Sequence, residues 1–323
     1  MKLLVGFVNS ETSLIVYDWA SHRIEWALPA SEMRTCGLCC WDDEFVVASD
    51  NKVVRFSESG QIEIQLPGPY PSMAHSVHPV NEKVLGVIDT GNSALHLFDR
   101  AGSMVDSITP FSAWGKLPPD AVHLNDIAVT QHGIIGSCFD HRPWRDSQRR
   151  MTWREWCEGS FGLLINLDGH APCGRGAVLG CGLNHPHSLT MHRNRLYHCS
   201  SATGEFHCWG FDAKNRLHRL NDWHITERHF LRGAVCADDH WYLGGSTSRH
   251  GEQLAHNTAI YRFHEQSGKI EERELPLSGE IYELIVWREN SVPLSRLMHQ
   301  ADPYRRFMHA FVTEHTAGFG AES

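Results

Sequence analysis

The 323-residue sequence predicts an all-β protein, a six-bladed β-propeller built from four-stranded blades. Two observations support this fold class. Short β-rich runs recur from residue 2 to about residue 288, separated by turn-forming sequences such as SESG, DTGNS and SATG. A larger unit also recurs with a period of about 40 to 50 residues, which is typical of propeller blades.

The repeated unit begins with a polar and a small residue, and an alternating apolar run then leads into a second strand. A sixth opening strand, EIYELIVW at residues 280–287, has no partner strands after it. The five complete copies of the unit are residues 35–49, 74–90, 124–140, 186–201 and 231–246.

The N-terminus supplies the missing partners, because KLLVGFV, SLIVYDW and HRIEWAL read as three consecutive strands. We expect the last blade to be closed by one C-terminal and three N-terminal strands, since this closure removes exposed sheet edges. A two-sheet sandwich would not explain the repeat, and a seventh blade within residues 141–180 stays open. The propeller is predicted over residues 1–290, followed by a short C-terminal helix or tail at residues 291–323.

The composition excludes several classes of function. A formal net charge of −9 argues against nucleic-acid binding, which depends on Lys and Arg contacts to phosphate. No run approaches the roughly 20 apolar residues that a membrane span needs, and no signal-peptide pattern is present. Ten cysteines without the spacing of a disulfide framework indicate reduced thiols and a cytoplasmic protein. Cys36 and Cys39 form a CxxC with no second pair, so we interpret them as buried thiols.

Three stretches resemble strand pairs of the gluconolactonase/regucalcin (senescence marker protein) propeller superfamily: LNDIAVTQHG, PHSLTMHRNRLYHCSSATGEFHCWGFD and LRGAVCADDHWYLGGS. A second set of short motifs is similar to an uncharacterised bacterial family of that kind. These motifs are HLN, NHPHS with TGE, and RG followed by GGS. The resemblance covers roughly residues 70–290.

The resemblance implies a divalent cation at the top of the channel, bound by a Glu, an Asn and an Asp from the starts of inner strands. Asn125 matches the Asn. Arg34 and Cys36 stand where the family has its Glu, however, and Arg232 stands where it has its Asp. Calcium, which prefers oxygen ligands, is therefore less suited to this chain.

Aligning the openings of the repeated unit places six side chains at one level of the predicted channel. Because residues two apart on a strand face the same side, six more form a second level just above. The first level is Cys36, His75, Asn125, His187, Arg232 and Tyr282, and the second is Arg34, Met73, His123, His185, Phe230 and Glu280.

This alignment predicts a divalent transition metal bound by His75, His123, His187 and Asn125. Neutral imidazoles suit Fe, Zn, Mn, Ni or Cu better than they suit calcium. The chain has 23 histidines, however, and many have no such position. A metal-free polar pocket and purely structural histidines therefore remain as alternatives.

Three residues are predicted to be catalytic. His185 and Glu280 would move a proton, and Arg232 would clamp the carboxylate or phosphate of a small anionic molecule. The predicted substrate-binding residues are Arg232, Tyr282, Trp144 and Arg34.

Residues 140–158 interrupt a blade and contain three tryptophans and five arginines. An insertion of this length in a compact repeat is often functional, so we interpret it as a lid-like loop over the channel. The alternatives are a short helix that packs its tryptophans on the rim and a homodimer contact.

These observations together predict a metal-dependent enzyme acting on a small anionic metabolite in the central channel. The metal would polarise a carbonyl or activate water or O2. Hydrolase (lactonase), lyase or isomerase, and oxygenase chemistry all remain open, because the fold does not choose among them. The alternative is a non-catalytic propeller that serves as a binding or scaffold protein.

Overall fold

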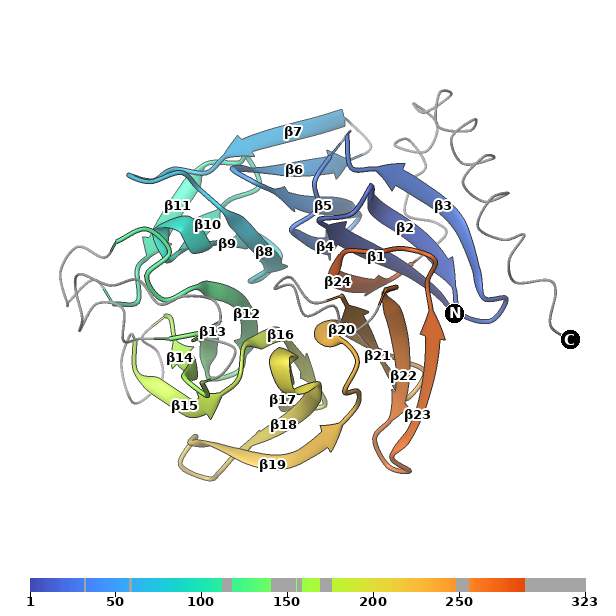
Figure 1. Cartoon of the computed structure of the whole chain (residues 1–323). Helices are drawn as coiled ribbons and strands as arrows, with labels where there is room; N and C mark the ends of the chain where they lie inside the picture. The colour runs from blue at the N-terminus through green and yellow to red at the C-terminus, as the bar shows by residue number, and fades with distance from the viewer. Residues whose placement is uncertain are drawn as a thin grey trace, which may run out of the picture.

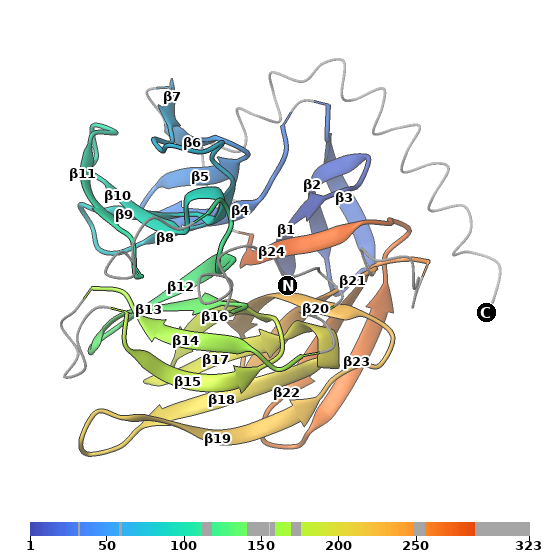
Figure 2. The same ribbon diagram turned by 60° about the vertical axis from the view of Figure 1, so that its left-hand side comes forward.

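Six antiparallel four-stranded sheets surround a central axis in the computed structural model, as Figure 1 and Figure 2 show. The predicted six-bladed propeller is thereby confirmed. A seventh blade was considered within residues 141–180. The described strands there, Gly162–Asn166 and the start of Val178–Leu183, belong instead to a blade that begins at residue 124. The structure describes residues 1–31, 33–57, 60–111, 118–140, 155, 159–168, 176–247 and 256–287.

Five blades are formed by strands that follow one another in the chain, with the first strand of each blade innermost. The described residues include the 3-10 turns η1 (Thr90–Asn92) and η3 (Ser201–Thr203), which lie between strands. The first two blades contain β4 (Gly37–Trp41), β5 (Glu44–Ser49), β6 (Lys52–Ser57) and β7 (Gly60–Gln65), then β8 (Ala74–Pro79), β9 (Leu85–Asp89), β10 (Ala94–Phe98) and β11 (Met104–Ile108). The third and fourth contain β12 (Leu124–Thr130), β13 (Gly133–Cys138), β14 (Gly162–Asn166) and β15 (Val178–Leu183), then β16 (Pro186–His192), β17 (Arg195–Ser200), β18 (Glu205–Phe211) and β19 (Leu217–His224). The fifth contains β20 (Phe230–Ala237), β21 (His240–Ser246), β22 (Ala259–His264) and β23 (Lys269–Glu274).

The last blade joins the two ends of the propeller, in the predicted order. Its strands are β24 (Glu280–Val286), β1 (Lys2–Val8), β2 (Thr12–Asp18) and β3 (Arg23–Pro29), with β24 innermost. β1 and β24 pair antiparallel, with Leu4 opposite Ile285 and Val5 opposite Leu284.

The outermost strand of each blade is the least buried, and the sequence explains why. β1 and β2 are apolar on both faces because neighbouring blades cover both faces of an inner sheet. The outermost strands, such as β23 with the sequence KIEERE, are polar and largely exposed. The hydrophobic clusters accordingly lie between adjacent blades, and one of them unites the last blade with β21 and β22.

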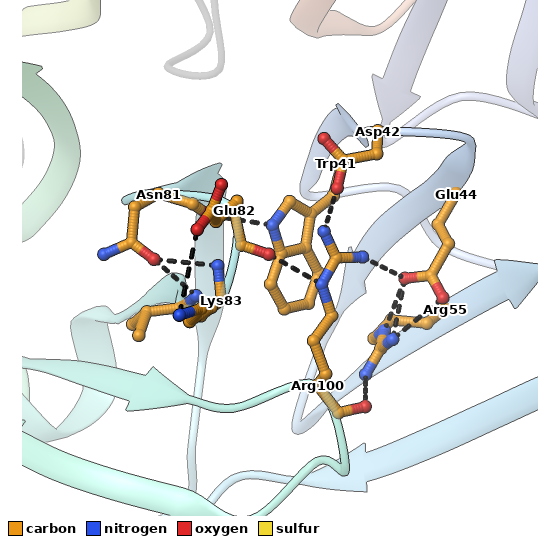
Figure 3. A network of polar contacts seen from close by, with 9 residues as sticks. Trp41, Asp42, Glu44, Arg55, Asn81, Glu82, Lys83 and Arg100 are labelled. Carbon is orange, nitrogen blue, oxygen red and sulfur yellow. Dashed lines mark hydrogen bonds and ion pairs between the residues drawn. The ribbon is translucent and has the colours of Figure 1, made fainter.

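A polar network holds the first two blades together at their rim (Figure 3). The guanidinium carbon of Arg100 lies 3.6 Å from the centre of the buried Trp41 ring, and Arg100 also pairs with Asp42. Arg55 binds Glu44 through two nitrogens and donates a hydrogen bond to the Arg100 carbonyl. Stacking of a guanidinium on indole adds cation–π attraction to these ion pairs.

The cysteines that the structure describes are all free thiols. Cys39, Cys138 and Cys199 are buried, and burial raises the pKa of each of them. Cys40 and Cys181 are exposed. In the described residues we find no helix long and apolar enough to cross a membrane.

Shortening Leu284 to alanine is expected to destabilise the closed ring. Leu284 is 1% exposed and packs in the cluster between the last blade and its neighbour, so Leu284→Ala should lower the free energy of unfolding by about 2–5 kcal/mol. Urea unfolding measures the change. Val105→Ala is the control, since Val105 is 54% exposed on β11 and should change stability by no more than about 0.5 kcal/mol. Equal effects of the two substitutions would contradict the closure described here.

Candidate active site in the central channel

β-Bulges interrupt the pairing of several inner strands near their starts. The extra residue is His75 on β8, Asn125 on β12, Gly233 on β20 and Tyr282 on β24. On β16 the irregularity follows His187. A bulge bends the strand and turns a side chain away from the regular pleat, and bulges are common beside active sites. In three of these blades the extra residue carries a polar side chain, and in the blade of β20 it is a glycine.

Two of the histidines have a left-handed backbone. His123 has a φ of 48° and His185 a φ of 47°, and each lies immediately before an inner strand. Such a conformation is uncommon for residues other than glycine, and at functional sites it persists because the surroundings enforce it. The two positions are equivalent in neighbouring blades, which indicates that this end of the channel is built to hold these imidazoles.

Four histidines meet at this end of the channel, and we call them the histidine cluster: His75, His123, His185 and His187. The ring centre of His75 lies 5.5 Å from that of His123 and 5.9 Å from that of His187. Phe139 stacks on both His123 and His185, at 4.3 and 4.2 Å. All four histidines are buried. The sequence prediction that other blades deliver histidines to the level of His187 is thus matched by the geometry.

The hydrogen bonds of His187 define its tautomer. Its Nδ1 lies 3.0 Å from the carbonyl oxygen of His185 and 2.7 Å from the Ser201 hydroxyl. Because a carbonyl only accepts, Nδ1 carries the proton and Nε2 carries the lone pair. Burial, followed by the positive charge of Arg232, holds the pKa of His187 well below its ordinary value of 6.5. Nε2 is buried and has no hydrogen-bond partner in the part of the chain that the structure describes.

His123 is oriented in the same way by a carboxylate. Its Nδ1 donates to Asp120 at 2.8 Å, and both side chains are almost completely buried. In the neutral ring the lone pair is then on Nε2. A carboxylate behind an imidazole is the arrangement that usually supports a metal-ligating or proton-accepting histidine.

Arg232 is the cation of this end of the channel. It is 2% exposed, and its Nη1 donates to Glu280 at 3.3 Å. Its Nη2 donates to Nε2 of His75 at 3.1 Å, and its guanidinium carbon lies 3.5 Å from the centre of the Tyr282 ring. Glu280 also accepts a hydrogen bond from Asn9 at 2.8 Å. Arg232 is therefore next to the histidine cluster, as predicted, but already paired within the fold.

The remaining predicted residues fall in different places. Asn125 is buried, and its Oδ1 accepts from Ser137 while its Nδ2 has no partner in the described part of the chain. Arg34 is half exposed and pairs with Asp50 at 2.9 Å, so the structure does not bring it to the cluster. Trp144 and nearly all of the insertion at residues 140–158 lie outside the described residues, as does the tail at residues 291–323.

Several residues of the site were not predicted from the sequence. Asp120, Ser201 and Phe139 orient or pack the histidines, but they lie on connections between strands, where a strand alignment cannot place them. The sequence gives a hint of Asp120 alone among these three residues, because it lies three residues before His123. A second group, His78 and Glu283, lies farther along the inner strands and lines a cavity.

The donor set fits a metal ion only in part. His187 offers an orphaned buried nitrogen, and rotating the Asn125 amide would turn its oxygen to the position of the unpartnered Nδ2. His75, in contrast, uses its Nε2 to accept from Arg232. Among the described residues, no three His, Cys, Asp or Glu side chains are placed to share one ion.

The Arg232–Glu280 pair should be strongly coupled in stability. Arg232→Met leaves the buried Glu280 without its cation and is expected to cost about 3–5 kcal/mol, whereas adding Glu280→Gln should recover much of that loss. Urea unfolding of both single variants and the double variant gives the coupling energy. Arg193→Ala, in an exposed pair with Asp239, is the control and should cost no more than about 1 kcal/mol. If the change in the free energy of unfolding of the double variant equals the sum of the changes in the two single variants, direct pairing of Arg232 with Glu280 is contradicted.

Several solved structures are similar to this chain. A protein of unknown function from Bacteroides caccae is 13% identical, covering 88% of this chain and 97% of its own, with a TM-score of 0.56. A chain from a nidogen/laminin complex has the same coverage and TM-score at 11% identity. Regucalcin from Agrobacterium tumefaciens, described as a calcium-binding protein, is 12% identical, covering 75% of this chain and 73% of its own, with a TM-score of 0.47.

No protein-family model matches the sequence, and no curated protein matches it. At identities this low, the structural likeness shows the fold and leaves the activity to be argued from the site. The chain is a six-bladed β-propeller, and solved structures that cover 88% of it are similar in fold.

Proposed function

We propose that this protein is a hydrolase or lyase that acts on a small anionic molecule at the histidine-lined end of its channel. The observation that carries the proposal is the Nε2 atom of His187. It is a neutral imidazole nitrogen with its lone pair unpartnered in the described part of the chain, and it lies in a buried cluster beside Arg232. Proton abstraction from an anionic substrate needs a base that accepts the proton and a fixed cation that stabilises the negative charge. His187 and Arg232 would supply these two groups.

The roles follow from the tautomers and charges. Arg232 would bind the substrate carboxylate, exchanging its long contact with Glu280 for a bidentate one. His187 would accept a proton from the substrate carbon or from a water at Nε2, while the His185 carbonyl and Ser201 stabilise the resulting imidazolium. Tyr282, which lies against the guanidinium, would keep Arg232 in the plane required for that clamp. The charge that develops on the substrate would remain beside Arg232.

A divalent transition metal is the proposed cofactor, with His123 and Asn125 as its ligands and His75 joining them when Arg232 turns to the substrate. His187 is not one of these ligands, because the only lone pair of its ring, on Nε2, is needed to accept the proton. Such an ion would polarise a carbonyl or lower the pKa of a bound water. Because Arg232 and a metal ion repel each other, the two are compatible only with an anion between them. The proposal therefore links metal affinity to the presence of the anionic substrate.

A second candidate is a non-catalytic propeller that binds an anion. One observation favours it, namely that Arg232 is almost fully buried and already bonded to both Glu280 and His75. In such a protein the cluster would be a rigid recognition site, and no histidine would exchange protons with the ligand.

Replacing His187 should separate these two candidates. In D2O, the wild type incubated with a panel of hydroxy acids and anionic lactones should give product or carbon-bound deuterium detectable by proton NMR. His187→Ala should reduce the rate by about 100-fold or more, since the base is removed. His218→Ala, at an exposed position on β19, should leave the rate unchanged. Turnover that survives in His187→Ala would exclude this base, and binding of a panel member without any turnover would favour the second candidate.

The metal is tested separately by elemental analysis of the purified protein and by titration with Zn, Mn, Fe, Ni and Cu salts. Metal content should fall in His123→Ala, because that change removes a proposed ligand. It should rise in Arg232→Met, because that change frees the His75 nitrogen and removes a like charge. If the wild type and both variants bind none of these ions, with and without the carboxylate panel, the cofactor proposal is wrong.

A further inference from the structure

A second site lies farther along the same channel. A cavity of about 660 Å³ is lined by the later residues of all six inner strands, whereas the histidine cluster uses their first residues and the connections before them. We call this space the far cavity. It receives side chains from every blade, and it shares no lining residue with the histidine cluster.

His78 and Asp126 form an ion pair at the wall of the far cavity. The Nε2 atom of His78 lies 2.7 Å from Oδ1 of Asp126, which also accepts from the backbone N–H of Ile127. The other oxygen of Asp126 accepts from the backbone N–H of Leu189 at 2.6 Å. Burial alone would lower the pKa of His78, but the charge and hydrogen bond of Asp126 outweigh it and raise that pKa. The Asp126 carboxylate is thus satisfied within the fold.

Glu283 differs from Asp126 because half of its carboxyl group is unused. Its side chain lines the far cavity and Glu283 is only 9% exposed. One oxygen accepts from the N–H of Leu284 at 3.1 Å, and the other has no hydrogen-bond partner among the described residues. This oxygen is not sealed from the cavity, so water or a ligand there can supply the missing donor. It is therefore the group of the far cavity best placed to bind a ligand.

The charge and shape of the cavity indicate the chemical class of that occupant. Its described lining contains three acidic residues, Asp42, Asp126 and Glu283, against one histidine and no lysine or arginine. Most of the remaining wall is apolar, with Leu38 and Ile127 as examples. Small-molecule sites commonly combine such walls with a few oriented polar groups. A cation with an apolar body would match both properties.

We propose that the far cavity binds a small organic cation, a protonated amine on an apolar body, with the Glu283 carboxylate as its charged partner. A bare divalent metal fits less well, because it needs several oxygen or nitrogen ligands and no three suitable side chains are grouped among the described residues. The amine requires only the open oxygen of Glu283 and contact with the walls. This inference uses none of the residues to which the proposed activity assigns a role.

The ionisation of Glu283 gives the binding a definite pH dependence. Burial, followed by the nearby charge of Asp126, raises the pKa of Glu283 from 4.5 to about 8, while His78 and Arg232 act in the opposite direction. Near neutral pH the empty cavity therefore holds a mainly neutral carboxylic acid. An amine that binds to its ionised form must displace the proton, so affinity should increase as pH rises from 6 to 8.

Calorimetry with three probes of similar shape tests the proposal: benzylamine, benzyl alcohol and benzoate. Benzylamine should bind the wild type, more tightly at pH 8 than at pH 6, and should bind at least tenfold better than the other two. Glu283→Gln keeps the side-chain size and should weaken benzylamine binding at least tenfold and abolish its pH dependence. Glu227→Gln, at a side chain that is 87% exposed, is the matched control and should bind like the wild type.

Three outcomes would overturn the proposal: no benzylamine binding by a folded wild type at millimolar concentration, tighter binding of benzoate, or unchanged benzylamine binding in Glu283→Gln. Urea unfolding shows whether Glu283→Gln is folded, and Glu283→Asp, which retains the charge, should keep more of the binding than Glu283→Gln does. His187→Ala should not affect benzylamine binding, so failure of the proposed activity and failure of this site can be distinguished.

The same carboxyl group predicts how stability changes with pH. The pKa of Glu283 is raised in the folded state, so its stabilising contribution is complete below about pH 4.5 and is lost as pH rises toward 8. The slope attributable to this one group is at most about 1.4 kcal/mol per pH unit. Urea unfolding between pH 5 and 8 should therefore show a smaller loss of stability in Glu283→Gln than in the wild type. Parallel profiles would mean that the pKa of Glu283 is not raised.

Discussion

The pairing of β1 with β24 is the interaction on which the rest of this molecule depends. It joins residues separated by almost the whole described chain and converts an open row of sheets into a ring. Without this pairing, the facing edges of β1 and β24 would carry unpaired backbone N–H and C=O groups, which the closed ring avoids. β24 also supplies Glu280 and Tyr282 at one end of the channel and Glu283 at the other. Neither site is complete until the last blade has closed.

The fold was predictable because its repeat is visible in the chain. The five copies of the strand-opening pattern, and the orphan strands at the two ends, are enough to define six blades and their closure. The meeting of His75, His123, His185 and His187 also followed, because equivalent positions in a propeller converge on one axis.

The directions of individual side chains along the inner strands were not predictable from the sequence. The β-bulges interrupt the alternation of side chains between the two faces of a strand, and that alternation is the basis for assigning each residue to a face. Counting by twos from His75 leads to Val77, which is buried in the core between blades, whereas His78 faces the cavity. Counting by twos from Tyr282 skips Glu283 and leads to Leu284, which packs in the core between blades and also lines the cavity. Pairings between side chains are equally invisible in a sequence, as the ion pair that keeps Arg34 at the surface shows.

Arg232 connects the two ends of the channel electrostatically. Its charge lowers the pKa of His187 at one end and acts against the raised pKa of Glu283 at the other. In a buried channel such charges are poorly screened by solvent, so their influence extends farther than at the surface. An anion bound to Arg232 would offset this charge and favour the neutral form of Glu283. The two ends are thus expected to respond to one another without any movement of the blades.

The buried cysteines give opening of the ring a lasting chemical consequence. Cys39, Cys138 and Cys199 are held as unreactive thiols in the folded blades, since oxidants attack the thiolate and burial suppresses it. A chain whose blades separate exposes these sulfurs at once, and oxidation beyond the sulfenic acid cannot be reversed by simple thiols. A polar sulfinate would not fit back between apolar strands. The lifetime of this protein under oxidising conditions is therefore governed by how often its ring opens, which makes it a kinetic property rather than an equilibrium one.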